Sequence, residues 1–307
     1  YLGFTRVLLN IFKIKKKINE TTDRIIEFNP NILFSIDSPD FTLRVAEKIK
    51  KLKPNIKTIH YVAPQVWIWR KGRIKKIKSF IDHIFLLFKF EKKYFDDENI
   101  ESTFVGHPLL DSENRTKFEN KNDITIEKII SIYPGSRLTE INTLMPILID
   151  FIHLMNKKEN NFIYIFHSTA EYENTISQFL TNSEIKNYKI ISKENEKCNF
   201  LKKSTLAIAK SGTISLEIAN NGIPFITIYK MNFLNFFIIK LLVKVKYANI
   251  INIINKSEII PELLQSNCNS NYIYKLVNKY IQEPELCKQQ VYNYRKILKE
   301  IKSETLS

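Results

Sequence analysis

The sequence predicts an α/β protein built from two successive Rossmann-like domains, each with a doubly wound parallel sheet. Short, nearly continuous apolar runs alternate with helical patterns along the chain, as in proteins whose strands are buried on both faces. The polar segment 111–123 interrupts this alternation, which then restarts. A length of 307 residues suits two domains of about 150 residues each. We therefore expect domains at 1–115 and 124–307.

In the first domain, the apolar runs predict strands and the segments between them predict helices. Pro30 and Asp37-Ser38-Pro39 bound the first run, which is typical of a buried parallel strand that ends in a loop. The predicted strands are 31–36, 57–62, 83–88 and 103–105, and the predicted helices are 1–28, 41–52, 73–80 and 90–97.

The second domain repeats the pattern. Its predicted strands are 128–133, 161–167, 188–192, 205–209 and 224–229, and its predicted helices are 139–156, 170–182, 195–203 and 212–220. Residues 271–303 carry apolar side chains at helical spacing, and we expect Pro284 to break that helix because proline has no N–H to donate.

Composition narrows the class of protein. Lys and Arg number 47 against 32 Asp and Glu, a net charge of +15. Such a charge favours contact with nucleic acid, an anionic membrane surface or a phosphorylated substrate, although drift towards Lys, Asn and Ile explains the excess equally well. Three scattered cysteines support neither a disulfide framework nor a zinc site. No signal peptide pattern or run of about 18 uncharged apolar residues occurs.

Candidate residues of the first domain lie in loops that follow its strands, where open parallel sheets bind ligands. Asp37 directly follows apolar residues, so we expect it to be partly buried and able to accept a proton. Asp40 is either a second carboxylate of the same site or the residue that caps the next helix. Trp67 and Trp69 precede a run of cations and suit stacking on bases, a lipid interface or a core contact. His107 is expected to point toward a cleft between the domains.

Two turns of the second domain favour binding of an anion. Gly135, Ser136 and Arg137 link a strand to a helix, and backbone N–H groups at a helix start attract phosphate. Lys210-Ser211-Gly212-Thr213 repeats this arrangement, without the spacing of a P-loop. Glu217 lies on the same helix face as Thr213 and is either a ligand for ribose hydroxyls or an exposed capping residue. Residues 223–245 are either an interfacial amphipathic segment or a core strand and helix.

Together these segments resemble the lipid-A-disaccharide synthases, which are bacterial glycosyltransferases of the GT-B fold. The matching segments occur in the family's order between Leu2 and Gln265. They are Ile36–Phe41 (IDSPDF), Lys57–Pro64 (KTIHYVAP), Val66–Arg70 (VWIWR), Phe90–Lys92 (FEK), Phe104–Pro108 (FVGHP), Pro134–Arg137 (PGSR), Ser211–Thr213 (SGT) and Ile259–Gln265 (IIPELLQ).

The resemblance implies two Rossmann-like domains facing a cleft. It also implies inverting transfer of 2,3-diacylglucosamine from UDP-2,3-diacylglucosamine to 2,3-diacylglucosamine 1-phosphate (lipid X), without a cofactor or a metal. Asp37 then corresponds to the family's catalytic base and Arg137 to its diphosphate-binding arginine. Gly135, Ser136, Ser211, Gly212, Thr213, Glu217 and Asn252 correspond to nucleotide-binding positions, and Asp40, Trp67, Trp69 and His107 to the acceptor and lipid side.

Further expectations follow from the same resemblance. It implies a cytoplasmic enzyme held at the surface of an anionic inner membrane, with a homodimer as one possible assembly and no nucleic acid partner. The family begins with a strand, a G-E-x-S-G-D loop and a helix that have no counterpart here, so the first domain is expected to lack its opening strand-loop-helix units. Arg6 also stands where the family has Glu.

Two other functions fit the residues. One is a different GT-B nucleotide-sugar enzyme, either another UDP-sugar transferase or a 2-epimerase. The other is a non-catalytic basic protein that binds membranes or nucleic acid, although no RRM, KH or zinc-finger pattern supports the nucleic acid version.

Overall fold

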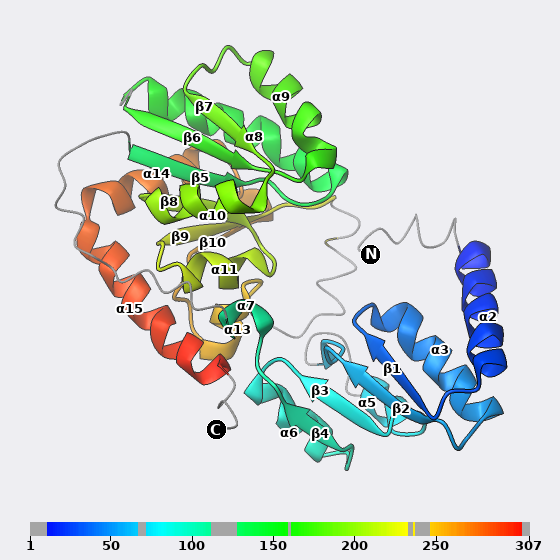
Figure 1. Cartoon of the computed structure of the whole chain (residues 1–307). Coiled ribbons are helices and arrows are strands. Elements are labelled where there is room, and N and C mark those ends of the chain that lie inside the picture. The colour runs from blue at the N-terminus through cyan, green and yellow to red at the C-terminus, as the bar shows by residue number, and fades with distance from the viewer. Residues whose placement is uncertain are drawn as a thin grey trace. The chain divides into compact units, whose positions relative to one another are not determined.

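The chain folds into two compact α/β units, as the sequence predicts (Figure 1). A computed structural model describes residues 11–66, 72–111, 128–158, 161–232, 236 and 246–302. Unit 1 comprises residues 1–111, 232–245 and 300–307, and unit 2 comprises residues 112–231 and 246–299. Each unit contains a sheet in which every pair of neighbouring strands is parallel.

Unit 1 contains a four-stranded sheet in the order β1-β2-β3-β4. Its strands are β1 (Ile32–Ile36), β2 (Lys57–Tyr61), β3 (His83–Leu86) and β4 (Ser102–Phe104), and its helices are α2 (Ile11–Phe28), α3 (Pro39–Leu52), α5 (Gly72–Ile77), α6 (Lys92–Asp96) and α7 (Pro108–Asp111). Because each strand pairs with the next along the chain, the strand order does not reverse among the described residues of this unit. It therefore has the order of one half of a doubly wound sheet.

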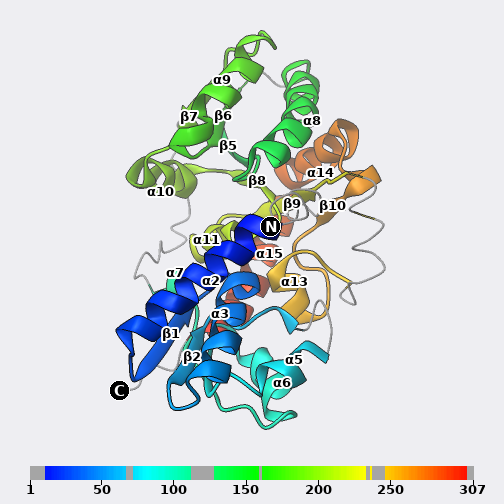
Figure 2. The same cartoon turned by 90° about the vertical axis from the view of Figure 1, so that its right-hand side faces the viewer.

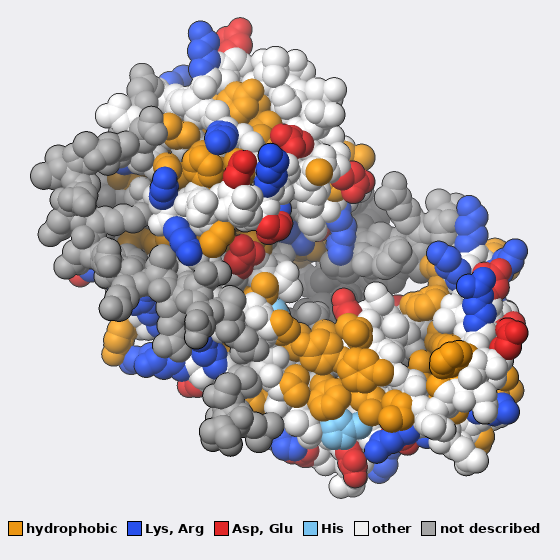
Figure 3. All heavy atoms as spheres, viewed as in Figure 1, with side chains coloured by type: hydrophobic (Ala, Val, Ile, Leu, Met, Phe, Trp, Pro, Cys, Tyr) orange, Lys and Arg blue, Asp and Glu red, His pale blue; other side chains and the backbone are white. Residues whose placement is uncertain are grey.

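The two faces of the unit 1 sheet differ. On one face, Leu33 of β1 packs with α2 and α3 around Ile18, Val45 and Ile49 (Figure 2). On the other face, alternate residues of β1 are about half exposed: Ile32 at 53%, Phe34 at 50% and Ile36 at 60%. Hydrophobic side chains accordingly gather over this sheet in the space-filling view (Figure 3). The described part of unit 1 thus presents an apolar sheet face.

Unit 2 contains a six-stranded sheet in the order β10-β9-β8-β5-β6-β7. Its strands are β5 (Lys128–Tyr133), β6 (Phe162–His167), β7 (Tyr188–Ile191), β8 (Leu206–Lys210), β9 (Phe225–Tyr229) and β10 (Glu262–Leu264). Its helices are α8 (Leu138–Asn156), α9 (Glu173–Thr181), α10 (Glu194–Lys203), α11 (Ile214–Asn220), α13 (Ile250–Asn255), α14 (Ser270–Gln282) and α15 (Pro284–Ile301). This is the Rossmann order, and it reverses between β5 and β8.

Both faces of the unit 2 sheet are covered. Helices α8, α9 and α14 pack on one face, where Ile130 and Ile132 of β5 join a core cluster with residues of these helices. The alternate residue Ile129 lies on the opposite face, in a smaller cluster with Phe200 of α10. By length and composition, α8 is the one helix in the described part of the chain that could span a membrane. In this structure it is a core helix of unit 2.

Most predicted elements are observed within a few residues of their expected limits. Pro284 divides the predicted helix 271–303, as expected, because α14 ends at Gln282 and Pro284 is the first residue of α15, where no N–H is needed. The prediction missed α7, α13 and β10, which have six residues or fewer. The sequence leaves two interpretations of residues 223–245, a core segment or an interfacial one. Residues 225–229 form the buried strand β9, as a core segment would. Residues 233–235 and 237–245 lie outside the described residues.

One buried side chain joins α15 to the edge of β9. The amide oxygen of Gln290 accepts the N–H of Phe225 at 2.7 Å, and its amide nitrogen donates to the Phe225 carbonyl at 3.0 Å. The same nitrogen lies 3.1 Å from the hydroxyl of Tyr280. Gln290 is only 3% exposed, so water does not replace these bonds easily.

Replacing this side chain tests its contribution to stability. Gln290→Leu leaves two backbone groups of β9 without their partners, and we expect the free energy of unfolding to fall by about 2–3 kcal/mol. Gln289→Leu, at the neighbouring exposed position, is the control and should change it by less than about 0.5 kcal/mol. Urea denaturation measures both, and equal effects would contradict this role.

Candidate functional site

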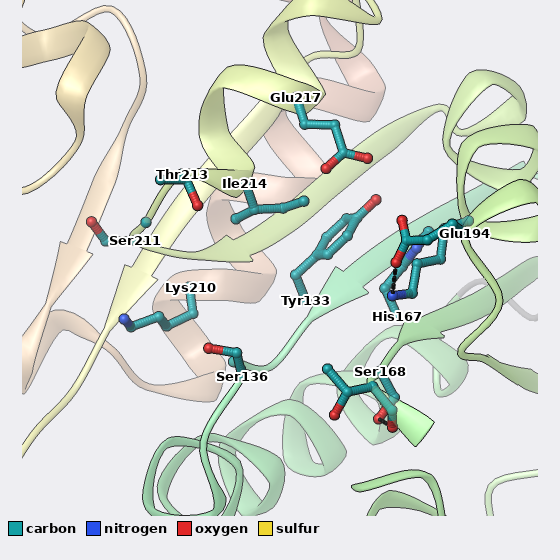
Figure 4. Close-up of a pocket in the computed structure, with 14 residues that line it drawn as sticks. Tyr133, Ser136, His167, Ser168, Glu194, Lys210, Ser211, Thr213, Ile214 and Glu217 are labelled. Atoms are coloured by element: carbon teal, nitrogen blue, oxygen red, sulfur yellow. Dashed lines mark hydrogen bonds and ion pairs between the residues drawn. The ribbon is translucent and has the colours of Figure 1, made fainter. Parts of the chain in front are cut away.

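A pocket lies in unit 2 at the carboxyl ends of the central strands, where the strand order reverses. Open parallel sheets bind ligands at such a point. Fourteen residues from β5, β6, α10, β8, α11 and their loops line it (Figure 4): Tyr133, Gly135, Ser136, His167, Ser168, Thr169, Glu194, Lys197, Lys210, Ser211, Gly212, Thr213, Ile214 and Glu217. The structure thus brings together both turns that the sequence singles out.

The first turn, Pro134–Arg137, places backbone donors and a cation at the start of α8. Gly135 has φ of +124°, which L-residues rarely adopt. The side chain of Glu140 lies against it, and its carboxylate accepts the N–H of Ser136 at 3.1 Å. Arg137 is the N-cap residue of α8, and its guanidinium lies 3.4 Å from Glu140. Half of the Arg137 side chain is exposed, which leaves it accessible to a ligand.

The second turn, Ser211–Thr213, connects β8 to α11. The hydroxyl of Ser211 donates to the carbonyl of Ala248 at 2.8 Å, which fixes one side of the turn. Gly212 and Thr213 are exposed. Glu217 lies one turn into α11, where burial, followed by the nearby Glu194, raises the pKa of its carboxyl. A partly buried carboxyl of this kind can accept hydrogen bonds from sugar hydroxyls.

The base of the pocket consists of two stacked rings that sequence reasoning did not assign to the site. Tyr133 and His167 lie 4.0 Å apart between ring centroids, with an angle of 15°. Ser131 bonds to His167 Nε2 at 2.8 Å, whereas His167 Nδ1 and the Tyr133 hydroxyl are buried without a hydrogen-bond partner among the described residues. Burial lowers the pKa of His167 to about 3, so the ring is neutral near pH 7.

The signal for these rings was present in the sequence. Tyr133 directly precedes the Pro134–Arg137 turn, and His167 is the last residue of β6. Both therefore lie at carboxyl ends of strands. Glu194 and Lys197, which are paired at 2.7 Å, reach the pocket from α10. A sequence alone does not show which face of the sheet that helix covers.

In unit 1, Asp37 lies in the loop between β1 and α3. Asp37 and Ser38 both have positive φ, at 50° and 46°. The Asp37 N–H donates to the carbonyl of Tyr61 at 2.9 Å, and the Thr42 hydroxyl donates to the Asp37 carbonyl at 2.7 Å. These bonds hold an unusual backbone conformation that asparagine and aspartate tolerate better than other non-glycine residues.

The expected partial burial of Asp37 is wrong, because this residue is exposed. It extends from the uncovered end of β1, where Ile36 is also exposed. Asp40 is exposed in the first turn of α3, and Ser38 is the N-cap residue in its place. His107 is 7% exposed and packs near Phe88, so it is buried within unit 1 and does not reach an open surface. Trp67 and Trp69 lie outside the described residues.

Asn252 does not line the pocket; it is a residue of α13, and its side chain is fully buried against the loop before β10. Its amide oxygen accepts the N–H groups of Ile259 and Ile260 at 2.8 and 2.9 Å. Its amide nitrogen donates to the Ile260 carbonyl and to Glu262, both at 2.7 Å. Because all four hydrogen-bonding positions are used within the chain, the predicted nucleotide contact of Asn252 is wrong in this structure.

Metal ligands are not grouped in the described part of the chain, where no set of three or more His, Cys, Asp or Glu residues could hold an ion. The pocket instead offers two cations, Lys197 and Lys210, together with the starts of α8 and α11. Arg137 lies at the start of α8 and is not itself among the residues that line the pocket. This arrangement suits an anion attached to a polar ring system.

Comparison with known proteins decides the family. A model of the lipid-A-disaccharide synthetase (LpxB) family matches residues 1–307. The chain belongs to the lipid-A-disaccharide synthase family. It is 38% identical over 309 residues to lipid-A-disaccharide synthase of Rickettsia prowazekii (strain Madrid E), covering 99% of this chain and 80% of that one. For the enzyme of Rickettsia bellii (strain OSU 85-389), the identity is 38%, over 98% of this chain and 79% of the relative.

Solved structures confirm the GT-B-like fold predicted for this lipid-A-disaccharide synthase family member. UDP-GlcNAc 2-epimerase from Neisseria meningitidis, bound to UDP-GlcNAc, superposes with a TM-score of 0.59 at 14% identity, over 94% of this chain and 80% of that one. MurG of Acinetobacter baumannii gives a TM-score of 0.57 at 10% identity, over 94% and 78%. At such low identities the likeness shows the fold alone.

The two glycines of the pocket provide a matched test of the Pro134–Arg137 turn. A β-carbon at Gly135 would lie 2.7 Å from Glu140 at a positive φ, whereas at Gly212 the nearest heavy atom would be 3.9 Å away. We expect Gly135→Ala to lower the free energy of unfolding by about 1–3 kcal/mol and Gly212→Ala to leave it nearly unchanged. Urea denaturation measures both variants. A tolerated Gly135→Ala would show that the turn is not constrained as described.

Proposed function

We propose that this chain transfers 2,3-diacylglucosamine from UDP-2,3-diacylglucosamine to lipid X and releases UDP. The family supplies the reaction class, which is glycosyl transfer. The observation that carries the assignment to this pocket is the pairing of the Pro134–Arg137 and Ser211–Thr213 turns on adjacent strands. Family membership favours this reaction over a 2-epimerase, since the epimerase likeness extends to the fold only.

The UDP group fits the pocket by its chemistry. Its diphosphate carries negative charge, which the α8 N-terminus and the Arg137 guanidinium favour. Its ribose hydroxyls can donate to Glu217, which lies one turn into α11. When the sugar leaves the diphosphate, negative charge develops on the UDP oxygen. Preorganised donors at that oxygen lower the barrier to transfer.

Asp37 is the proposed base for the acceptor. Its carboxylate takes the proton of the lipid X 6-hydroxyl as that oxygen bonds to the anomeric carbon, and the bond from that carbon to the diphosphate breaks with its electron pair leaving on UDP. One displacement of this kind inverts the anomeric configuration. The exposure of Asp37 and the two bonds that fix its backbone support this role, since a base needs both access and orientation.

Both sugars carry acyl chains, so we also propose that the protein works at an anionic membrane surface. A net charge of +15 and the apolar face around Phe34 support such an association.

The position of Asp40 at the start of α3, close in sequence to Asp37, favours an acceptor-side role for Asp40 as well.

The base assignment predicts a specific loss. Asp37→Asn removes the proton acceptor but keeps the size and the tolerance of positive φ, so we expect transfer to fall by about 10²–10⁴-fold with little change in UDP affinity. Transfer is measured with labelled UDP-2,3-diacylglucosamine and lipid X, and affinity by calorimetry. Asp97→Asn, at an exposed carboxylate after α6, is the control.

Two results would contradict this assignment. A loss of UDP affinity in Asp37→Asn would place Asp37 in the nucleotide site and not at the acceptor. Turnover of a water-soluble UDP sugar, with no disaccharide formed from lipid X, would overturn the proposed reaction in favour of another nucleotide-sugar enzyme.

The diphosphate assignment makes a separate prediction. Arg137→Ala should weaken UDP binding or slow transfer by about 2–4 kcal/mol, because a charged donor to the diphosphate is lost. Lys186→Ala removes an exposed cation of unit 2 that precedes β7, at the amino ends of the strands, and should change neither quantity. A change below about tenfold in Arg137→Ala would remove this residue from the diphosphate site.

A further inference from the structure

Three charged side chains meet where β5 and β8 end, and only Arg137 has a role so far. Glu140 Oε1 lies 3.0 Å from the Lys210 ammonium and 3.4 Å from the Arg137 guanidinium. The other oxygen of Glu140 accepts the N–H of Ser136. One carboxylate therefore contacts two cations and a backbone donor, although Lys210 ends β8 and Arg137 precedes α8.

The Lys210 side chain is held in place. It is the last residue of β8, it lines the pocket, and its side chain is only 17% exposed. Its ammonium also lies over the ring of Tyr229, 5.2 Å from the centroid, on the neighbouring strand β9. A lysine restrained by both an ion pair and a ring has lost much of the freedom that makes surface lysines weak ligands.

The charges in this cluster do not cancel. Two cations share one carboxylate, so the group keeps an excess of one positive charge beside the positive end of the α8 dipole. The Glu140 carboxylate itself shows how an anionic group fits here, with one oxygen between the two cations and the other accepting the Ser136 N–H. A diphosphate offers further oxygens of the same kind.

We propose that Lys210 is a second cation of the diphosphate subsite, and that Glu140 is the positioning residue that holds it beside Arg137. This inference rests on the proposed UDP site. In this proposal Lys210 contacts the phosphates of UDP. It contacts neither the ribose nor the uracil ring. Lys210 contributes charge, Ser136 and α8 contribute donors, and Glu140 keeps the two cations from turning away when no nucleotide is bound.

The test compares UDP with uridine, which lacks the phosphates. We expect Lys210→Gln to weaken UDP binding by about 10- to 100-fold, the usual effect of losing a charged hydrogen bond, and to change uridine binding by less than about twofold. Lys210→Arg should restore most of the UDP affinity, because it returns the charge. Calorimetry on the full chain measures both ligands, and melting curves check that each variant is folded.

Lys197 is the matched control. Its side chain is 16% exposed, it lines the same pocket, and it is paired with Glu194 on α10, away from the first turn of α8. Lys197→Gln should therefore alter UDP and uridine affinity by the same factor. The ratio of the two affinities separates a phosphate contact from a general change in the pocket.

Glu140→Gln tests the positioning role. It keeps an acceptor for the Ser136 N–H but removes the charge that holds the two cations, so we expect weaker UDP binding and a smaller effect of Lys210→Gln in the double variant. Tighter UDP binding in Glu140→Gln would overturn this role. If the wild type binds UDP and Lys210→Gln leaves the UDP-to-uridine ratio unchanged, the inference about Lys210 is wrong and the UDP site stands. If the wild type binds no UDP, the proposed site itself is wrong.

Discussion

The reversal of strand order between β5 and β8 is the constraint on which the candidate site depends. Because β5 pairs with β6 on one side and with β8 on the other, the chain proceeds from β5 towards one edge of the sheet and from β8 towards the other edge. The loops at their carboxyl ends therefore diverge and leave room for a ligand. The turns at Pro134–Arg137 and Ser211–Thr213 occupy this point, and they can do so only while the two strands stay paired from Ile130 to Tyr133.

A buried polar network holds the second turn from behind. Glu262 of β10 accepts the N–H groups of Ala248 and Asn249. The side chain of Asn249 donates to Ser215 at the start of α11 and to Thr227 of β9. Ala248 in turn accepts the hydroxyl of Ser211. The edge strand is thereby linked to the pocket, and networks satisfied in this way rigidify the residues that they connect.

The sequence indicates far more about the fold than about how its polar residues are used. Apolar runs locate the strands, because apolar residue types favour burial. The glycine after β5 locates the turn at Gly135, because only glycine adopts such a backbone conformation freely. The burial of Asp37 was mispredicted, since it depends on what covers β1. The role of His167 depends on Ser131, which is 36 positions away. The role of Asn252 depends on partners 7 to 10 positions away. No local sequence pattern indicates such pairings. The role of Lys210 likewise depends on Glu140 and Tyr229, which are distant in sequence.

The apolar face of the unit 1 sheet affects how the protein behaves in solution. Ile32, Phe34 and Ile36 are half exposed on a chain whose net charge is +15. Mutual repulsion keeps such molecules apart at low ionic strength, but added salt screens repulsion without weakening the hydrophobic effect. Self-association should therefore increase with salt, so that purification in concentrated saline favours aggregates and dilute buffer favours dispersed protein.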